Sequence, residues 1–146
     1  MKLSILLFSG ALLCAQSAKV DVVSNADMQR MQKKISGQKI GSEPLARYSN
    51  SSMQIIRRET SGVPELHQTK ADIFYVRDGE ATLIEGGTVV KPKTSAPNEI
   101  RGESIAGGAK HVLGAGDMVH IPAGVPHQLM LAPGKTFTYI AIKIDQ

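Results

Sequence analysis

The chain has 146 residues, of which 17 are lysine or arginine and 13 are aspartate or glutamate, giving a formal net charge of +4. This length predicts one domain. The basic residues are scattered, aromatic residues make up 4% and tryptophan is absent, so the chain lacks an evident stacking platform and we expect no nucleic-acid partner.

The first 17 residues have the layout of a secretory signal peptide. Lys2 supplies a positive start, residues 3–13 form an apolar run too short to span a bilayer, and small residues follow up to Ser17. Cleavage there also removes Cys14, the single cysteine, and leaves a chain without disulfides. We expect a secreted or periplasmic protein with no membrane association after cleavage.

Residues 18–50 are expected to form a short helix and an extended segment that precede the main domain. Ser24 and Asp27 have the spacing of a capping box, which predicts a helix over 26–35. The following stretch, 37–52, is rich in turn-forming residues and is expected to cross the surface.

Residues 51–146 are predicted to form an all-β domain. Short extended segments follow one another, separated by turn signals such as RDGE, EGG, GAGD and APGK. A series of short strands with few helical stretches is typical of a barrel or a sandwich. The expected strands cover 53–59, 72–76, 81–84, 88–90, 100–104, 111–113, 118–121, 128–131 and 136–144.

Histidines and carboxylates in this domain have the composition of a metal site. Glu65 lies two residues before His67, so both side chains would project from the same face of a strand. Asp72 begins the next apolar run, and His127 follows a turn that two prolines and a glycine make rigid. Two imidazoles with carboxylates are suitable ligands for a divalent metal with open positions.

The stretch GDMVHIPAGVPH resembles the second signature of the cupin superfamily. Gly116, Pro122, Gly124 and His127 fill its slots, whereas Leu131 stands where cupins usually have asparagine.

The first cupin signature is matched in part. His67, Asp72 and Gly79 hold the slots of its second histidine, its acidic residue and its closing glycine. Glu65 replaces the first histidine, and Glu59 replaces the opening glycine. The middle segment, 99–108, is similar to the GE.RG.SI.GG stretch of some cupins.

The resemblance implies a small, exported, single-domain cupin with a conserved type-2 barrel, which is a double-stranded β-helix or jelly roll. It implies that His67, Asp72 and His127 are metal ligands and that Glu65 contributes a carboxylate. Asp72 either binds the ion itself or orients His67. Iron, manganese, zinc and nickel all remain open as the ion.

The main functional hypothesis is a metal-dependent enzyme, such as a dioxygenase or an isomerase, that acts on a small metabolite in the barrel. Glu65, or His120 if it faces inward, would be the catalytic proton-transfer residue. One of Arg57 and Arg58 is expected to point inward, which would favour an anionic substrate.

Two other hypotheses stay open, a non-catalytic module that binds a small ligand and a barrel without a working site. His111 is expected at the surface. Exposed sheet edges predict a homodimer.

Overall fold

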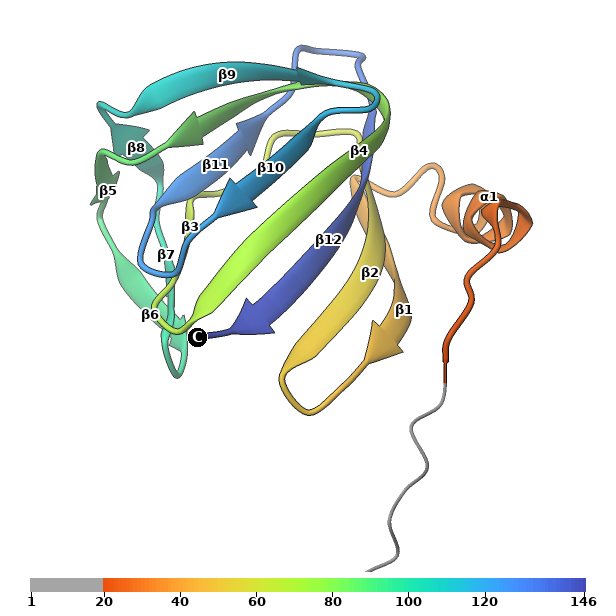
Figure 1. Cartoon of the computed structure of the whole chain (residues 1–146). Helices are drawn as coiled ribbons and strands as arrows, with labels where there is room; N and C mark the ends of the chain where they lie inside the picture. Colours follow the sequence, from red (N-terminus) through yellow and green to blue (C-terminus); the bar gives the residue numbers. More distant parts are fainter. Residues whose placement is uncertain (1–19) are drawn as a thin grey trace, which may run out of the picture.

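Two halves of one curled antiparallel sheet enclose a common core in the computed structural model, which describes residues 20–146 (Figure 1). The elements are α1 (Asn25–Lys34), β1 (Ile40–Arg47), β2 (Ser51–Arg58), β3 (Glu65–His67), β4 (Lys70–Glu85), β5 (Thr88–Val90), β6 (Lys93–Ala96), β7 (Glu99–Arg101), β8 (Ser104–Ala106), β9 (Ala109–Gly114), β10 (Met118–Ile121), β11 (His127–Met130) and β12 (Phe137–Asp145). The predicted all-β jelly roll is confirmed. The predicted signal peptide lies outside the described residues.

The long strand β4 belongs to both halves of the sheet. Its first part pairs with β10 and β12, and its second part pairs with β9 and β11. We expected two strands here with a turn at RDGE, and that prediction is wrong. Gly79 instead adopts a positive φ of 81°, and β12 shifts register between Thr138 and Tyr139, so β4 bends there without ending.

Replacing Gly79 with alanine is expected to lower the free energy of unfolding by about 3 to 5 kcal/mol. A Cβ at this position would overlap the carbonyl oxygen of Thr136, in addition to the cost of a positive φ. The matched control is Gly86→Ala, where φ is also positive but no atom lies within 4 Å of the new Cβ. This control should lose only about 1 kcal/mol. Urea unfolding measures both, and equal losses would contradict the steric argument.

Two strands lie in segments that we expected to be turns or surface crossings. β1 pairs only with β2 among the described residues, so it is an edge strand. Pro44 is tolerated there because an edge strand has free positions for a residue without N–H, and the register shifts between Pro44 and Ala46. β6 forms a hairpin with β7, and the connecting Asn98 adopts a positive φ of 62°.

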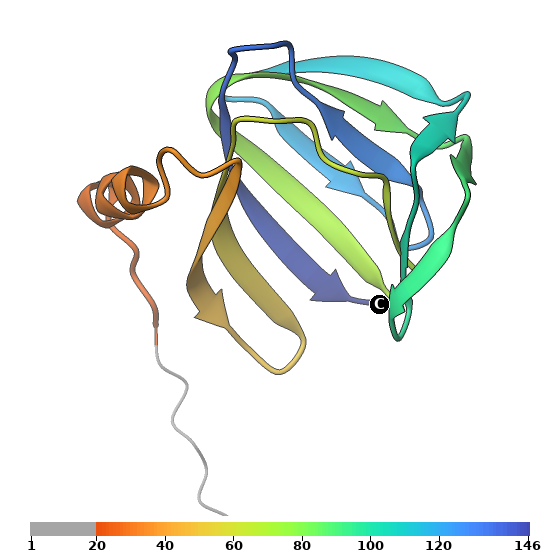
Figure 2. The same ribbon diagram turned by 180° about the vertical axis from the view of Figure 1, so that it is seen from behind.

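The helix α1 confirms the prediction made from the capping box. The Ser24 side chain accepts from the Asp27 N–H, and the Asp27 carboxylate accepts from the Ser24 N–H. The helix lies outside the barrel, beside β1 and β2, in Figure 1 and Figure 2. It contains no buried residue, whereas Ile35, directly after it, is buried. No helix within residues 20–146 has the length and apolar character needed to cross a membrane.

Apolar side chains fill the middle of the barrel, because alternate residues of each strand point inward. Tyr139 and Phe137 on β12 are the largest fully buried members, and Phe74 packs against Tyr139 with ring centroids 4.9 Å apart. The cluster comprises Ile56, Phe74, Val76, Ala81, Leu83, Leu113, Ile121, Leu129, Phe137, Tyr139 and Ala141. Charged and polar side chains lie next to this core rather than within it.

Candidate metal centre

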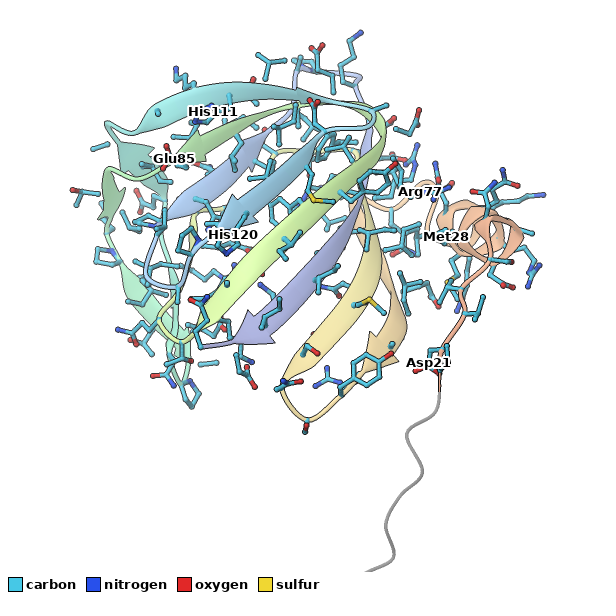
Figure 3. All side chains as sticks on the ribbon, viewed as in Figure 1. Asp21, Met28, Arg77, Glu85, His111 and His120 are labelled. Carbon is cyan, nitrogen blue, oxygen red and sulfur yellow. The ribbon has the colours of Figure 1, made fainter. Side chains whose placement is uncertain are left out.

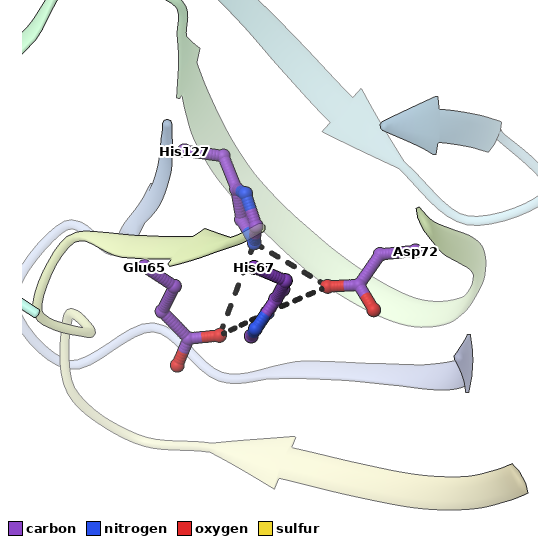
Figure 4. Close-up of side chains that lie close together, drawn as sticks. All are labelled: Glu65, His67, Asp72 and His127. Carbon is purple, nitrogen blue, oxygen red and sulfur yellow. Dashed lines mark ion pairs between the residues drawn. The ribbon is translucent and has the colours of Figure 1, made fainter. Parts of the chain in front are cut away.

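Four side chains from three strands meet beside the core (Figure 4). Glu65 and His67 come from β3, Asp72 from the start of β4 and His127 from the first position of β11. One ligand atom from each lies within 4.8 Å of all the others. The structure therefore brings together all four residues that the sequence predicted as metal ligands.

Local structure explains how His127 is aimed at this point. Gly124, with a φ of 79°, lies in the turn before His127, and its N–H donates to the carbonyl of His67 at 2.8 Å. His127 then pairs with Glu65 in the register of β11 and β3. The rigid turn is thus fastened to the strand that carries two of the other ligands.

The spacing of the four donor atoms fits a single ion. Asp72 Oδ2 lies 3.2 Å from His67 Nε2 and 3.4 Å from His127 Nε2. Glu65 Oε2 lies 3.5 Å and 3.8 Å from the same two nitrogens. Donors bound at about 2.1 Å to one ion lie about 3.0 to 3.4 Å apart in octahedral or tetrahedral arrangements. Asp72 meets this spacing, whereas Glu65 lies slightly farther away.

Both imidazoles are oriented by a contact at Nδ1. His67 Nδ1 contacts the carboxylate of Glu99, and His127 Nδ1 lies 3.1 Å from the carbonyl oxygen of Val125. Acceptors at Nδ1 favour the tautomer that leaves Nε2 free to bind a metal. His127 Nε2 is buried and has no hydrogen-bond partner within the described part of the chain. The residues present therefore fit a metal ion.

The carboxylates are ionised at neutral pH. Burial would raise the pKa of Asp72, but the adjacent His127 and His67 imidazoles hold it well below its usual range. Burial would likewise raise the pKa of Glu65, but His67 and Arg101 outweigh it and lower this pKa to about 2. Two negative charges at one buried point favour a cation between them.

The same carboxylates change the pKa of His67. Burial would lower the pKa of this imidazole, but the carboxylates of Asp72 and Glu65, 3.2 and 3.5 Å from Nε2, outweigh burial and raise the pKa to about 9. A metal ion that binds His67 at neutral pH must therefore displace a proton.

Three further residues contact the cluster and were not predicted as site residues. Lys143 on β12 reaches His67 and Asp72, Arg101 contacts Glu65, and Glu99 contacts His67. Lys143 stands directly opposite Asp72 in the pairing of β12 with β4. Alternation along β12 could have placed Lys143 on the inward face, but its partner depends on register between distant strands.

His120 is not part of the cluster. It lies on β10 opposite Ile73 and is exposed, so it does not face the cluster as a catalytic role there would require. His111 is also exposed, with Nε2 3.5 Å from the Glu85 carboxylate (Figure 3). Both histidines line a separate cavity of about 700 Å³ formed by residues of β4, β9, β10 and the turn before β11.

Of the two consecutive arginines, Arg58 is the inward one. It is buried, and its Nε donates to the Tyr139 hydroxyl at 3.0 Å, whereas Arg57 contacts Glu59. No carboxylate of the described residues forms an ion pair with Arg58. A buried guanidinium without a carboxylate partner adds positive charge to the interior.

Solved structures with the same arrangement of strands identify the fold. TT1209 from Thermus thermophilus matches with a TM-score of 0.62 at 12% identity, over 86% of this chain and 98% of that chain. The Cnp3 cupin domain from Schizosaccharomyces pombe matches with a TM-score of 0.56 at 6% identity, over 75% of this chain and 66% of that chain. This chain has the cupin fold.

An enzyme is among the structures similar to this cupin barrel. The polyketide cyclase RemF from Streptomyces resistomycificus matches with a TM-score of 0.53 at 17% identity, over 75% of this chain and 67% of that chain. No protein-family model and no curated protein matches the sequence. At these identities the likeness shows the cupin fold alone.

Proposed function

We propose that this cupin is a metal-dependent enzyme that holds one divalent transition-metal ion between His67, His127, Asp72 and Glu65. The observation that carries the proposal is His127 Nε2, a buried nitrogen without a hydrogen-bond partner among the described residues that lies 3.4 Å from Asp72 Oδ2. Two imidazoles with carboxylates suit iron, manganese, zinc or nickel better than magnesium or calcium.

The bound ion would supply Lewis-acid chemistry, or oxygen activation where it is iron. Asp72 and the two histidines are almost fully buried and form the fixed side of the site. Glu65 is more exposed, at 23% of its side chain, and its Oε2 is the donor farther from both histidines. Glu65 is therefore the carboxylate best placed to accept a proton from a substrate, and His67 together with Arg101 keeps it ionised.

One buried cation in the barrel and one at the cluster favour a small anionic metabolite as substrate. Arg58 is buried beside Tyr139 without a carboxylate partner in residues 20–146, and Lys143 lies at the cluster itself. Desolvated guanidinium and ammonium groups bind carboxylates through charge-assisted hydrogen bonds.

Metal analysis of three proteins tests the proposal. The unaltered chain and the control His111→Ala, purified without chelator, are expected to contain close to one transition-metal ion per chain. His127→Ala should lose the ion, because it removes a buried ligand, whereas His111 is exposed and lies outside the cluster. A chain that stays empty after reconstitution with each candidate ion would contradict the proposal.

The cavity between β9 and β10 favours a second candidate, a non-catalytic module for a small ligand. Its lining is partly apolar and includes none of the four cluster residues. A ligand whose affinity survives chelation of the metal would support this alternative. Export through the first 17 residues and a homodimer stay predictions.

A further inference from the structure

Lys143 places a positive charge at the candidate metal centre. Its Nζ lies 2.7 Å from His67 Nε2, and 2.7 and 3.0 Å from the two carboxylate oxygens of Asp72. The contacts follow from the fold, because Lys143 is the cross-strand partner of Asp72.

These contacts use the same atoms that a metal ion would use. His67 Nε2 has one site, which is filled by a proton, by a hydrogen bond or by a metal ion, but by only one of them at a time. Asp72 Oδ2, the oxygen nearest both imidazoles, is also within reach of Nζ. An ion bound to both atoms therefore excludes the ammonium from its present position.

We propose that Lys143 is a built-in competitor of the metal, whose ammonium occupies the cation position in the metal-free protein and leaves it when an ion binds. The inference rests on the proposed function above, because it assigns the metal to the same four residues. In the metal-free state the ammonium helps to compensate the charge of the buried Asp72 carboxylate.

The displaced side chain has space outside the cluster. Lys143 is 25% exposed and also borders a surface hollow of about 90 Å³. Residues of β1, β2, β4 and β12 line this hollow, among them Asp145. The flexible four-carbon stem of lysine allows such a movement without a change of backbone.

Competition with an ammonium lowers the affinity of every ion that must displace it. An ion displaces Lys143 only if it gains enough from His67 and Asp72 together. Transition metals bind imidazole well, whereas magnesium and calcium prefer oxygen ligands and gain little from His67. With Lys143 in place, the weakly bound oxygen-preferring ions should leave the site empty at concentrations at which transition metals fill it.

Affinities for Zn²⁺ and Mn²⁺, measured by competition with a chromogenic chelator, test the inference. Lys143→Met and Lys143→Gln are both expected to bind each ion about tenfold or more tightly than the unaltered chain. The matched control is Lys70→Met, which removes an equal charge from a lysine whose only ion-pair partner in the described chain is Asp145, at 3.7 Å. Its affinities should change by less than about threefold.

Each outcome decides one question. Unchanged or weaker binding in folded Lys143 variants, with binding in the unaltered chain, would overturn the role of Lys143 and leave the metal site in place. Binding in the Lys143 variants but not in the unaltered chain would support it most strongly. No binding in any variant would overturn the proposed function itself. Circular dichroism checks folding, and Lys143→Gln keeps a donor for Asp72 if Lys143→Met does not fold.

Discussion

Asp72→Asn is expected to weaken metal binding by more than about 100-fold, whereas Glu65→Gln should weaken it by only about tenfold. Both variants replace a carboxylate with an amide of the same shape, so each removes one negative charge. The expected difference follows from position, since Asp72 is 1% exposed and its Oδ2 is closer to both histidines than Glu65 Oε2 is.

Asp72→Asn should also destabilise the metal-free protein, because Lys143 and His67 lose the carboxylate that both of them contact. Removing one partner of a buried ion pair costs about 3 to 5 kcal/mol. Glu65→Gln should cost less, since Glu65 is more exposed and its partner Arg101 is 36% exposed. Chelator competition and urea unfolding measure the two effects. If Glu65→Gln proved the more damaging of the two in metal affinity, Glu65 would be the principal carboxylate ligand and Asp72 the residue that orients His67.

The metal-free protein is expected to be most stable between about pH 4.5 and 6.5, as far as Glu65 and His67 contribute. Folding lowers the pKa of Glu65 from 4.5 to about 2, so its stabilisation is present above pH 4.5 and is lost as the pH falls towards 2. Folding raises the pKa of His67 from 6.5 to about 9, so its stabilisation is complete below pH 6.5 and is lost as the pH rises through 9.

Bound metal should remove the loss of stability that the metal-free protein shows at alkaline pH. A bound ion takes the place of the proton on His67, so the loaded protein should not lose this contribution between pH 6.5 and 9. The difference in Tm between loaded and metal-free protein should therefore grow over that interval. Thermal unfolding of both forms from about pH 4 to 9.5 provides the measurement. His111→Ala is the control, and a constant difference in Tm would show that no proton leaves His67 on binding.

The ligand set was predictable because two short stretches of the sequence resemble the cupin signatures, and those signatures are local patterns. Glu65 and His67 are two residues apart, so one strand is enough to place both on the same face. The dense proline and glycine pattern before His127 predicted a rigid turn, and the structure shows that turn fastened to the His67 carbonyl through Gly124.

The contacts of Lys143, Glu99 and Arg101 with the cluster could not be predicted, because they depend on which strands become neighbours. Lys143 reaches Asp72 only because β12 pairs with β4 in one particular register, and no pattern within either segment encodes that register. Glu99 and Arg101 were noted only as part of a middle segment, and their contacts with β3 arise from the pairing of β7. The sequence predicts two strands in place of β4, because a glycine between two apolar runs usually ends a strand. In the structure the sheet bends at Gly79 instead.

The two strands β4 and β3 carry ligands of the same site but differ in how extensively their backbones are paired. β4 is paired on both sides over residues 72–75 and 82–85, so the amides of these stretches should exchange with solvent only when the whole domain unfolds. β3 has only three residues, pairs with the equally short β7 on one side and is paired with β11 at a single position on the other. Brief opening of β3 would separate Glu65 and His67 from Asp72 while the remainder of the barrel stays intact. An ion would then enter and leave through local fluctuation of one short strand, at a rate set independently of global stability.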